Sequence, residues 1–337
     1  MGREEVGQAP FASAQGRRGP APTGSGKLVR QVTQGEWAVT SLEGVDEKGG
    51  AIYFTATEKS PLERHLYRVG LDGGEAARVS QEDGSHGVAM SPDARHYVDT
   101  YSNVMTPPQQ NLCRADGTQV RALQENRNAG LAEYALQKPE FLQARAGDGT
   151  ALHAMMIKPR GFDESRKYPV LIFTYGGPHS QIVRDSWGGN RFLWHQMMAQ
   201  KGYIIFYLDN RGMTGRGHAF ESHVHKRMGE IELADQLAGV NYLKSLAYVD
   251  GSRIGIWGWS YGGYMTLYAM LNAPEVFKAG FAGAPVTAWE NYDTIYTERY
   301  MSTPQKNPEG YKKSAPLNHA ANLEGKLLIA HGTADDN

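Results

Sequence analysis

Between residues 27 and 138, short runs of apolar and β-branched residues alternate with turn sequences. Asp-Gly and Gly-Gly pairs separate these runs, and such pairs supply the positive φ angles that tight hairpins need. One strand–turn–strand unit covers residues 66–79 and a second covers 111–123, at a spacing of about 45 residues that suits one four-stranded propeller blade. The pattern therefore predicts a partial all-β propeller of about two blades. The predicted strands are residues 28–32, 51–56, 65–69, 77–79, 97–101 and 119–123.

After residue 139 the pattern changes to strands that alternate with helices. Residues 168–175 and 203–208 are continuous apolar runs, which are typical of strands buried on both faces of a parallel sheet. Residues 232–246 carry apolar residues at helical spacing along one stripe. This order predicts a doubly wound α/β sheet over residues 139–337. Further strands are predicted at 253–257, 278–282 and 326–330, and a further helix at 264–271.

The first 26 residues differ from the rest of the chain. They are rich in Gly, Pro, Ala and Arg and show almost no apolar periodicity, so we expect a disordered tail. The sequence thus divides into three expected segments: a tail at 1–26, a partial propeller at 27–138 and an α/β domain at 139–337.

Composition and charge exclude several classes of protein. Lys and Arg number 35 against 36 Asp and Glu, so nothing favours nucleic acid or an anionic membrane as the main partner. Cys113 is the one cysteine, which excludes an intrachain disulfide and a metal site built on several thiolates. The longest apolar runs are too short to cross a bilayer. We therefore expect a soluble protein without a metal or cofactor, in the cytoplasm or in a periplasmic or secreted location.

The candidate chemistry lies in the segment Gly258-Trp259-Ser260-Tyr261-Gly262, between a predicted strand and a predicted helix. This G-x-S-x-G pattern in a strand–turn–helix context is typical of a nucleophile elbow. Glycines on either side let the chain turn sharply, and the N–H after the serine points to where an oxyanion would form. A structural glycine turn is the alternative interpretation.

The sequence around this elbow resembles the prolyl oligopeptidase clan, and more narrowly its dipeptidyl peptidase IV branch. That branch removes N-terminal dipeptides ending in Pro or Ala. The resemblance implies an α/β-hydrolase fold, truncated at its C-terminus, preceded by a partial propeller. Two alternatives remain: a non-catalytic peptide-binding relative, and an acylaminoacyl peptidase or oligopeptidase of the same clan. The resemblance is carried by residues 256–264 (IWGWSYGGY), 174–178 (TYGGP), 209–212 (DNRG), 292–301 (YDTIYTERYM) and 331–337 (HGTADDN).

The resemblance also implies catalytic roles. Ser260 would be the nucleophile, Asp335 the acid that orients a histidine, and the Tyr175 hydroxyl and the Tyr261 N–H the two oxyanion donors. Independently, Asp335 closely follows a predicted buried strand, where a triad acid is expected. Spacing alone leaves the adjacent Asp336 open.

Aromatic residues would set the substrate preference. Trp289, Tyr292 and Tyr296 are spaced i, i+3 and i+7, so on one helix they would line one face. Without the resemblance such a stripe is typical of core packing, whereas the resemblance makes it a pocket for a proline ring. By the same resemblance, Val286 belongs to the pocket wall and Asn337 supplies a carbonyl-binding amide.

Two pieces of the family pattern are not found in this sequence. In the order Ser, Asp, His the base follows Asp335, but all eleven histidines precede it. The glutamate pair that binds the substrate amine in the family's early propeller region is also missing. We therefore expect residues 1–337 to be a fragment that is inactive alone. Its parent would act on peptides with Pro or Ala second, and the resemblance implies a homodimer for full-length members.

Overall fold

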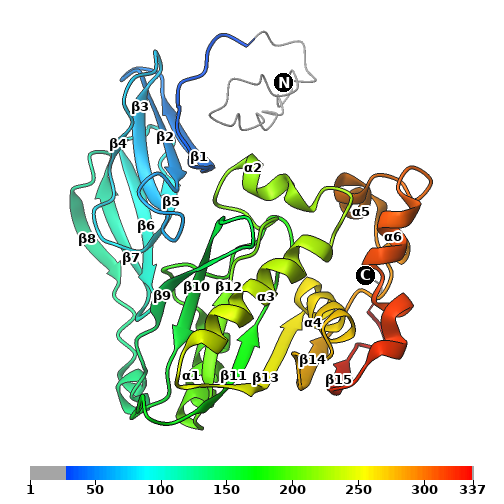
Figure 1. Ribbon diagram of the computed structural model, residues 1–337. Coiled ribbons are helices and arrows are strands. Elements are labelled where there is room, and N and C mark those ends of the chain that lie inside the picture. The colour runs from blue at the N-terminus through cyan, green and yellow to red at the C-terminus, as the bar shows by residue number, and fades with distance from the viewer. Residues whose placement is uncertain (1–27, 336–337) are drawn as a thin grey trace. The chain divides into compact units, whose positions relative to one another are not determined.

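The computed structural model describes residues 28–335 (Figure 1). The tail expected at 1–26, Asp336 and the proposed pocket residue Asn337 lie outside the described residues. The chain forms two compact units. The described part of the first runs to Ala129 and includes residues 184–187 and 215–219, and the second comprises the remaining residues from Gly130 onward.

The first unit contains two four-stranded antiparallel sheets, each with its strands in chain order. This arrangement confirms the predicted all-β segment before the α/β region. The first sheet holds β1 (Val39–Asp46), β2 (Ala51–Ala56), β3 (His65–Gly70) and β4 (Ala77–Arg78). The second holds β5 (Ser85–Met90), β6 (His96–Asn103), β7 (Thr106–Arg114) and β8 (Gln119–Gln124).

Several strand assignments in this unit differ from the sequence-based ones. Residues 28–32, predicted as a strand, form none. β1 and β5 were not predicted, and β7 was anticipated only at its end. β5 contains glycine and histidine and β7 is mostly polar, so neither shows the apolar alternation that marks a strand. Backbone pairing with their neighbours holds them in place instead.

A small apolar core joins the two sheets of the first unit. Tyr53 and Leu66 from the first sheet pack in one cluster with Tyr97 and Cys113 from the second. Burial of Cys113 raises the pKa of its thiol, as expected for a cysteine that serves as a packing residue.

The second unit is built on a seven-stranded sheet in the order β15-β14-β13-β11-β12-β10-β9. The five strands from β15 to β12 are parallel, which confirms the predicted α/β architecture. β9 and β10 add an antiparallel edge that the pattern did not predict. The strands are β9 (Glu140–Arg145), β10 (Ala151–Ile157), β11 (Tyr168–Phe173), β12 (Ile204–Leu208), β13 (Val249–Trp259), β14 (Ala279–Gly283) and β15 (Lys326–Ala330).

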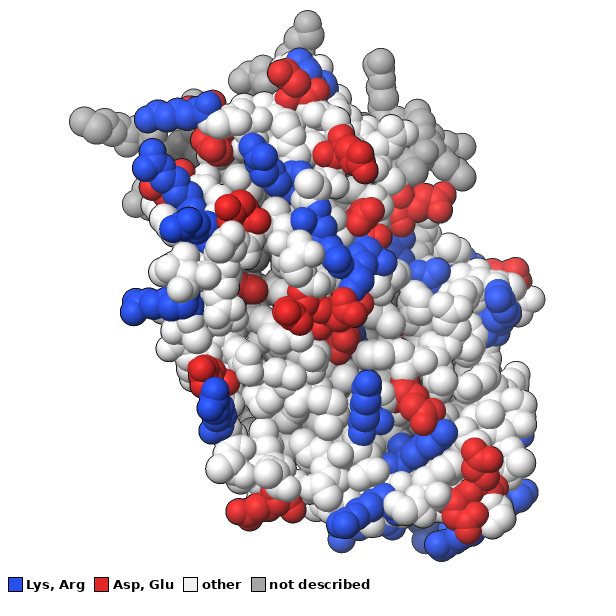
Figure 2. All heavy atoms as spheres, turned by 90° about the vertical axis from the view of Figure 1, so that its left-hand side faces the viewer, with Lys and Arg blue, Asp and Glu red and all other residues white. Residues whose placement is uncertain are grey.

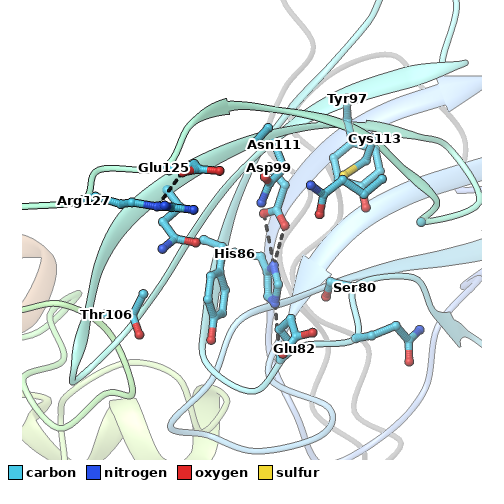
Figure 3. Close-up of a pocket in the computed structure, with 16 residues that line it drawn as sticks. Ser80, Glu82, His86, Tyr97, Asp99, Thr106, Asn111, Cys113, Glu125 and Arg127 are labelled. Carbon is cyan, nitrogen blue, oxygen red and sulfur yellow. Dashed lines mark hydrogen bonds and ion pairs between the residues drawn. The ribbon is translucent and has the colours of Figure 1, made fainter.

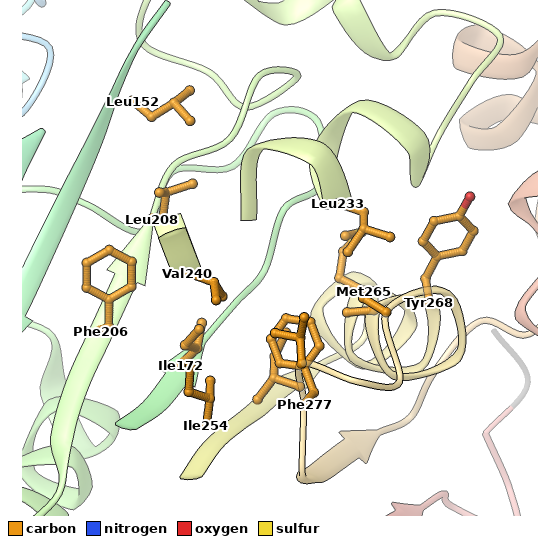
Figure 4. Close-up of a cluster of buried hydrophobic side chains, with 14 of the residues drawn as sticks. Leu152, Ile172, Phe206, Leu208, Leu233, Val240, Ile254, Met265, Tyr268 and Phe277 are labelled. Carbon is orange, nitrogen blue, oxygen red and sulfur yellow. The ribbon is translucent and has the colours of Figure 1, made fainter. Parts of the chain in front are cut away.

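Side chains alternate along the central strands, so the two sheet faces have different partners. Ile172, Phe206 and Ile256 join the main core together with side chains of α3 and α4, part of which Figure 4 shows. The next residues along these strands, Phe173, Tyr207 and Trp257, contact His195 of α1 on the opposite face. Helices therefore cover both faces of the sheet.

The helices of the described residues are short to medium in length. The α-helices are α1 (Gly189–Gln200), α2 (His218–Glu221), α3 (Glu230–Ser245), α4 (Tyr261–Asn272), α5 (Thr294–Met301) and α6 (Pro308–Ser314). The 3₁₀ turns are η1 (Ala129–Tyr134), η2 (Ser222–Val224), η3 (Trp289–Asn291) and η4 (Pro316–Asn322). Within residues 28–335, none of these helices combines the length and apolar character needed to cross a bilayer. On the face shown in Figure 2, side chains of both charges are interspersed.

The strand order fixes where a site can form. Strands β12 and β13 lie on opposite sides of β11, so the winding of the sheet reverses there. Parallel strands end at one edge, and the crevice beyond their carboxyl ends at such a reversal is the usual ligand site of open α/β sheets. Tyr175, Ser260, Val286 and Asp335 follow β11, β13, β14 and β15 respectively, and all four therefore belong to this edge.

Candidate active site

Ser260 lies at the sharp turn between β13 and α4. Its φ of 58° and ψ of −119° fall outside the regions that L-residues ordinarily occupy, so the backbone is strained here. A Cβ at Gly258 or at Gly262 would clash with the carbonyl oxygen of Thr174, at the end of β11. Only glycine at these positions lets α4 lie this close to the strand. The Ser260 N–H donates to the Gly283 carbonyl oxygen at 2.9 Å and holds the turn.

A cavity of about 310 Å³ opens beside Ser260 within the second unit. Asp335, Val286 and Tyr292 line the same cavity, so it brings together residues predicted for the nucleophile, the acid and the pocket wall. His331 is the one histidine that lines this cavity among the described residues. The other lining residues are Trp259, Ala284, Pro285, Thr287, Ala288 and Asn291.

Tyr175 follows β11, and Ser260 is one of the groups that affect the pKa of its hydroxyl. Burial raises the pKa of the Tyr175 phenol, and a hydrogen bond with Ser260 offsets only part of that rise. The phenol is therefore neutral at pH 7 and keeps its O–H. The turn after Tyr175 is held by Asn210, whose side-chain amide donates to the Gly176 carbonyl oxygen at 3.0 Å.

Tyr261 is the first residue of α4, where backbone N–H groups have no acceptor within the helix. Its side chain is buried, and its hydroxyl donates to Oε1 of Glu232 on α3 at 2.7 Å. Glu232 is wholly buried, and this burial raises the pKa of its carboxyl group to about 7. A carboxyl group therefore lies directly behind the residue that follows the candidate nucleophile.

The aromatic residues Trp289, Tyr292 and Tyr296 do contact one another, but not along one helix as their spacing predicted. Trp289 belongs to η3, Tyr292 is extended, and Tyr296 lies in α5 after a break capped by Asp293. The ring centroid of Trp289 is 5.7 Å from that of Tyr292 and 6.2 Å from that of Tyr296. Trp289 is 1% exposed, so it packs behind the half-buried Tyr292 in the core, and Tyr292 is the member of the three that lines the cavity.

Asp335 lies in a turn after β15. Its Oδ2 is 3.5 Å from Nε2 of His331, and both side chains are partly exposed. Asp335 thus lines the cavity with Ser260 and contacts a ring nitrogen, which is the kind of group that a triad acid orients.

The first unit holds a larger cavity, of about 660 Å³, which also contains Ser, His and Asp side chains (Figure 3). His86 is hydrogen-bonded at both ring nitrogens: Nδ1 bonds the Asp99 carboxylate at 2.8 Å, and Nε2 donates to the Glu82 carbonyl oxygen at 2.9 Å. Ser80 Oγ accepts the Leu66 N–H at 3.0 Å and also bonds the His65 ring. His86 and Ser80 are occupied by structural hydrogen bonds, so this histidine is not available as a base for that serine.

Sequence reasoning missed three residues of the smaller site. Asn210 was noticed only as part of a motif, although it fixes the turn after Tyr175. Glu232 lies on the buried side of α3, and a glutamate within an apolar helical stripe was a signal of an internal partner. His331 precedes the proposed triad acid in the sequence, so the family order predicts no role for it. No group of three His, Cys, Asp or Glu side chains within residues 28–335 is arranged to hold a metal ion.

Comparisons with known proteins agree with this geometry. A sequence model of the prolyl oligopeptidase family matches residues 191–337, and one of the dipeptidyl peptidase IV (DPP IV) N-terminal region matches residues 20–108. Dipeptidyl peptidase 8 of Homo sapiens is 35% identical over 339 residues, covering 94% of this chain and 38% of that protein. A probable dipeptidyl-aminopeptidase B of Arthroderma gypseum is 39% identical over 317 residues, and the match covers 91% of this chain and 34% of that protein.

Solved structures give the same result. The crystal structure of Porphyromonas gingivalis dipeptidyl peptidase 4 superposes with a TM-score of 0.87 at 39% sequence identity, covering 91% of this chain and 44% of that chain. The chain thus spans less than half the length of the relatives that it matches. Taken with the elbow and the two sheets of the first unit, these matches show that the chain belongs to the prolyl oligopeptidase family, in its dipeptidyl peptidase IV-like branch.

Proposed function

We propose that this protein is a serine-type dipeptidyl peptidase that releases N-terminal X-Pro or X-Ala dipeptides through an acyl-enzyme on Ser260. The observation that carries the proposal is the strained elbow at Ser260, which opens into a cavity shared with Asp335 and Tyr292. Strained backbone conformations cluster at active sites, and a residue that serves only for packing does not require one beside an open cavity.

In this proposal Ser260 Oγ attacks the carbonyl carbon of the second substrate residue. The oxyanion is stabilised by the Tyr261 N–H and by the Tyr175 O–H. The raised pKa of Tyr175 supports this role, because only the protonated phenol can donate. One such donor lowers the barrier by about 3–4 kcal/mol. A base takes the Ser260 proton and passes it to the leaving nitrogen, so collapse of the tetrahedral intermediate breaks the C–N bond and releases the shortened peptide as an amine. Water then hydrolyses the acyl-enzyme and frees the dipeptide.

The cavity wall supports a preference for proline. Tyr292 and Val286 present an aromatic ring and a branched aliphatic side chain, both suited to a flat, rigid pyrrolidine. Tyr292 is braced from behind by Trp289 and Tyr296, so its ring has little freedom to move. A wall of this kind binds a ring or a methyl group better than a long flexible side chain.

The base is the one member of the triad that residues 1–337 do not assign in the family order. His331 contacts Asp335 but precedes it, and we do not propose it as the base. Loss of the histidine from such a triad lowers the rate by on the order of a millionfold. A polypeptide of residues 1–337 is therefore expected to show little turnover unless a small base such as imidazole is added.

A covalent probe tests the proposal on this polypeptide. A dipeptidyl diphenyl phosphonate with proline at the reactive position should add to Ser260, with loss of phenol, as detected by intact mass and peptide mapping. Added imidazole should accelerate the labelling. The matched leucine phosphonate should label at least tenfold more slowly, and Ser260→Ala should not be labelled. Labelling that persists in Ser260→Ala, or equal labelling rates for the proline and leucine phosphonates, would overturn the proposal.

A further inference from the structure

Glu232 is a buried acid that the proposed chemistry does not use. It lies in the first turn of α3 and is 0% exposed, as is Asp235 one turn later. Asp235 has a full partner in Arg211, whose Nη2 lies 2.6 Å from Asp235 Oδ1. Within residues 28–335, Glu232 forms no ion pair and instead accepts hydrogen bonds from two neutral donors. A buried carboxyl group kept without a counter-ion costs stability, so its contacts merit a functional explanation.

Both carboxyl oxygens of Glu232 have defined partners. Oε1 accepts from the Tyr261 hydroxyl at 2.7 Å, and Oε2 accepts from the Gly229 N–H at 2.9 Å. Gly229 has a φ of 89°, and a Cβ there would clash with the hydroxyl of Tyr264 on α4. The start of α3 is therefore packed tightly against the first turns of α4, with the Glu232 carboxyl group joining them.

The ring of Tyr261 connects this carboxyl group to the candidate active site. Its centroid lies 6.1 Å from that of Tyr175 and 5.4 Å from that of Trp289. A Cβ at Gly177 would clash with the Tyr261 ring, so the turn that follows Tyr175 packs directly on it. The backbone of the same residue carries the N–H next to Ser260. Any rotation of the Tyr261 ring would therefore disturb Tyr175, Trp289 and the elbow together.

We propose that Glu232 is a positioning residue of the acyl-transfer site: its carboxyl group clamps the Tyr261 side chain to α3 and thereby holds both oxyanion donors in place. The inference rests on the proposed function, because it assigns Glu232 to the same reaction. Glu232 does not touch substrate in this scheme and acts through Tyr261.

The clamp has two forms, which differ in the direction of one hydrogen bond. When Glu232 is ionised, Tyr261 donates to it, and this charge-assisted bond is the stronger one. When Glu232 is protonated, its O–H donates to the Tyr261 oxygen while the other oxygen still accepts from Gly229. The groups that face the carboxyl are Asp235 on its own helix, Tyr261, Tyr264 and Tyr268 on α4, and Tyr296 on α5. Glutamine reproduces the protonated form, since its NH₂ can donate to Tyr261 and its oxygen can accept.

The test measures the second-order rate constant for labelling of Ser260 by the proline phosphonate, in the same polypeptide of residues 1–337. Glu232→Leu and Tyr261→Phe, which both break the clamp, should label at least tenfold more slowly. Glu232→Gln should reduce this rate constant by a smaller factor than either of them. Glu230→Gln is the matched control, because this glutamate lies two residues earlier on α3 and is exposed, and its rate should stay within twofold of wild type.

A pH series separates positioning from simple loss of folding. The ratio of the wild-type rate to the Glu232→Gln rate should increase as the pH rises through the range in which Glu232 ionises, and should be constant below it. Melting curves identify the folded fraction of each variant. If folded Glu232→Leu and Tyr261→Phe label at the wild-type rate, or if that ratio does not change with pH, the inference is wrong. A wild-type chain that fails to label Ser260 even with added imidazole contradicts the proposed function instead.

Discussion

The two cavities of this protein contain the same side-chain types but differ in which atoms are free to react. In the first unit, His86 uses both ring nitrogens and Ser80 Oγ is bonded to a backbone N–H and a histidine ring. In the second unit, Ser260 lies on a strained turn beside an open cavity, and the phenol of Tyr175, whose pKa Ser260 affects, stays neutral. Satisfied hydrogen bonds thus mark a structural cluster, whereas strain and an open approach mark a candidate nucleophile.

The comparison also shows that cavity size is a poor guide to chemistry. The first cavity is about 660 Å³ and the second about 310 Å³, yet the smaller one lies at the carboxyl edge of a parallel sheet. At that edge several loops converge, each fixed by its own strand. The larger cavity is lined mainly by strands of one antiparallel sheet, whose side chains already bond one another.

Replacing the serine of each cavity with alanine should give the largest difference in covalent labelling between the two cavities. Ser260→Ala is expected to abolish covalent labelling by a serine-directed fluorophosphonate, because the attacking oxygen is removed. Ser80→Ala should leave labelling of the folded protein unchanged, although the buried His65 loses a partner. Intact mass spectrometry after equal exposure measures both. Labelling that depends on Ser80 would reverse the assignment of the two cavities.

A tyrosine from each cavity gives the next largest contrast. Tyr175→Phe removes one proposed oxyanion donor and should slow labelling of Ser260 by roughly 10²–10³-fold. Tyr101 in the first cavity bonds the Asp83 carbonyl oxygen at 3.0 Å, so Tyr101→Phe should leave the labelling rate within twofold. Equal effects of the two substitutions would argue against a role for the Tyr175 hydroxyl.

Buried acid–base groups in the two units should respond to pH in a way that unfolding experiments detect. Burial raises the pKa of Glu232 from 4.5 to about 7, so the folded state holds this proton more tightly than the unfolded state. The stability from Glu232 is therefore present at low pH and lost as the pH rises from about 4.5 to 7. Glu232→Gln should gain roughly 3 kcal/mol relative to wild type across this window. A pH-independent difference in urea unfolding would contradict the raised pKa.

The His86–Asp99 pair of the first unit should show a smaller effect. Burial alone would lower the pKa of His86, but its hydrogen bond to Asp99 and the charge of Asp99 outweigh it and raise the pKa. The pair therefore stabilises the fold fully below about pH 6.5 and less as the pH rises through the raised pKa. Asp99→Asn should cost about 2 kcal/mol at pH 5.5 and less at pH 9. The exposed Asp83→Asn serves as control and should cause no measurable change at either pH.

Strong local signals allowed much of the second unit to be predicted. The strand at 326–330 was predicted with the bounds that β15 has, because it is a short apolar run bounded by polar residues. The elbow was predicted from a motif in which the glycines are needed for steric reasons. The structure agrees, because a Cβ at Gly258 or Gly262 would clash with the Thr174 carbonyl oxygen. In the first unit the polar strand β7 carried no such signal, because its neighbours rather than its own side chains determine its conformation.

The rest of the site depended on contacts distant in sequence. Helical spacing suggested one helix for Trp289, Tyr292 and Tyr296, but Asp293 caps a new helix between them, and the rings meet through tertiary packing. The partnership of Glu232 with Tyr261 joins residues 29 positions apart, and no pattern within either helix specifies it. Such pairs are set by how α3 and α4 pack, which a reading of local periodicity does not contain.

The positive φ of Ser260 has a consequence for how this protein can be stabilised. A side chain held in that conformation costs on the order of 1–3 kcal/mol, which a glycine at position 260 would recover. Selection for thermal stability alone would therefore favour loss of the hydroxyl at this elbow. A thermostability screen without an activity readout is expected to enrich Ser260→Gly. Under the proposed function, a serine at this unfavourable position exchanges stability for reactivity at a single backbone torsion.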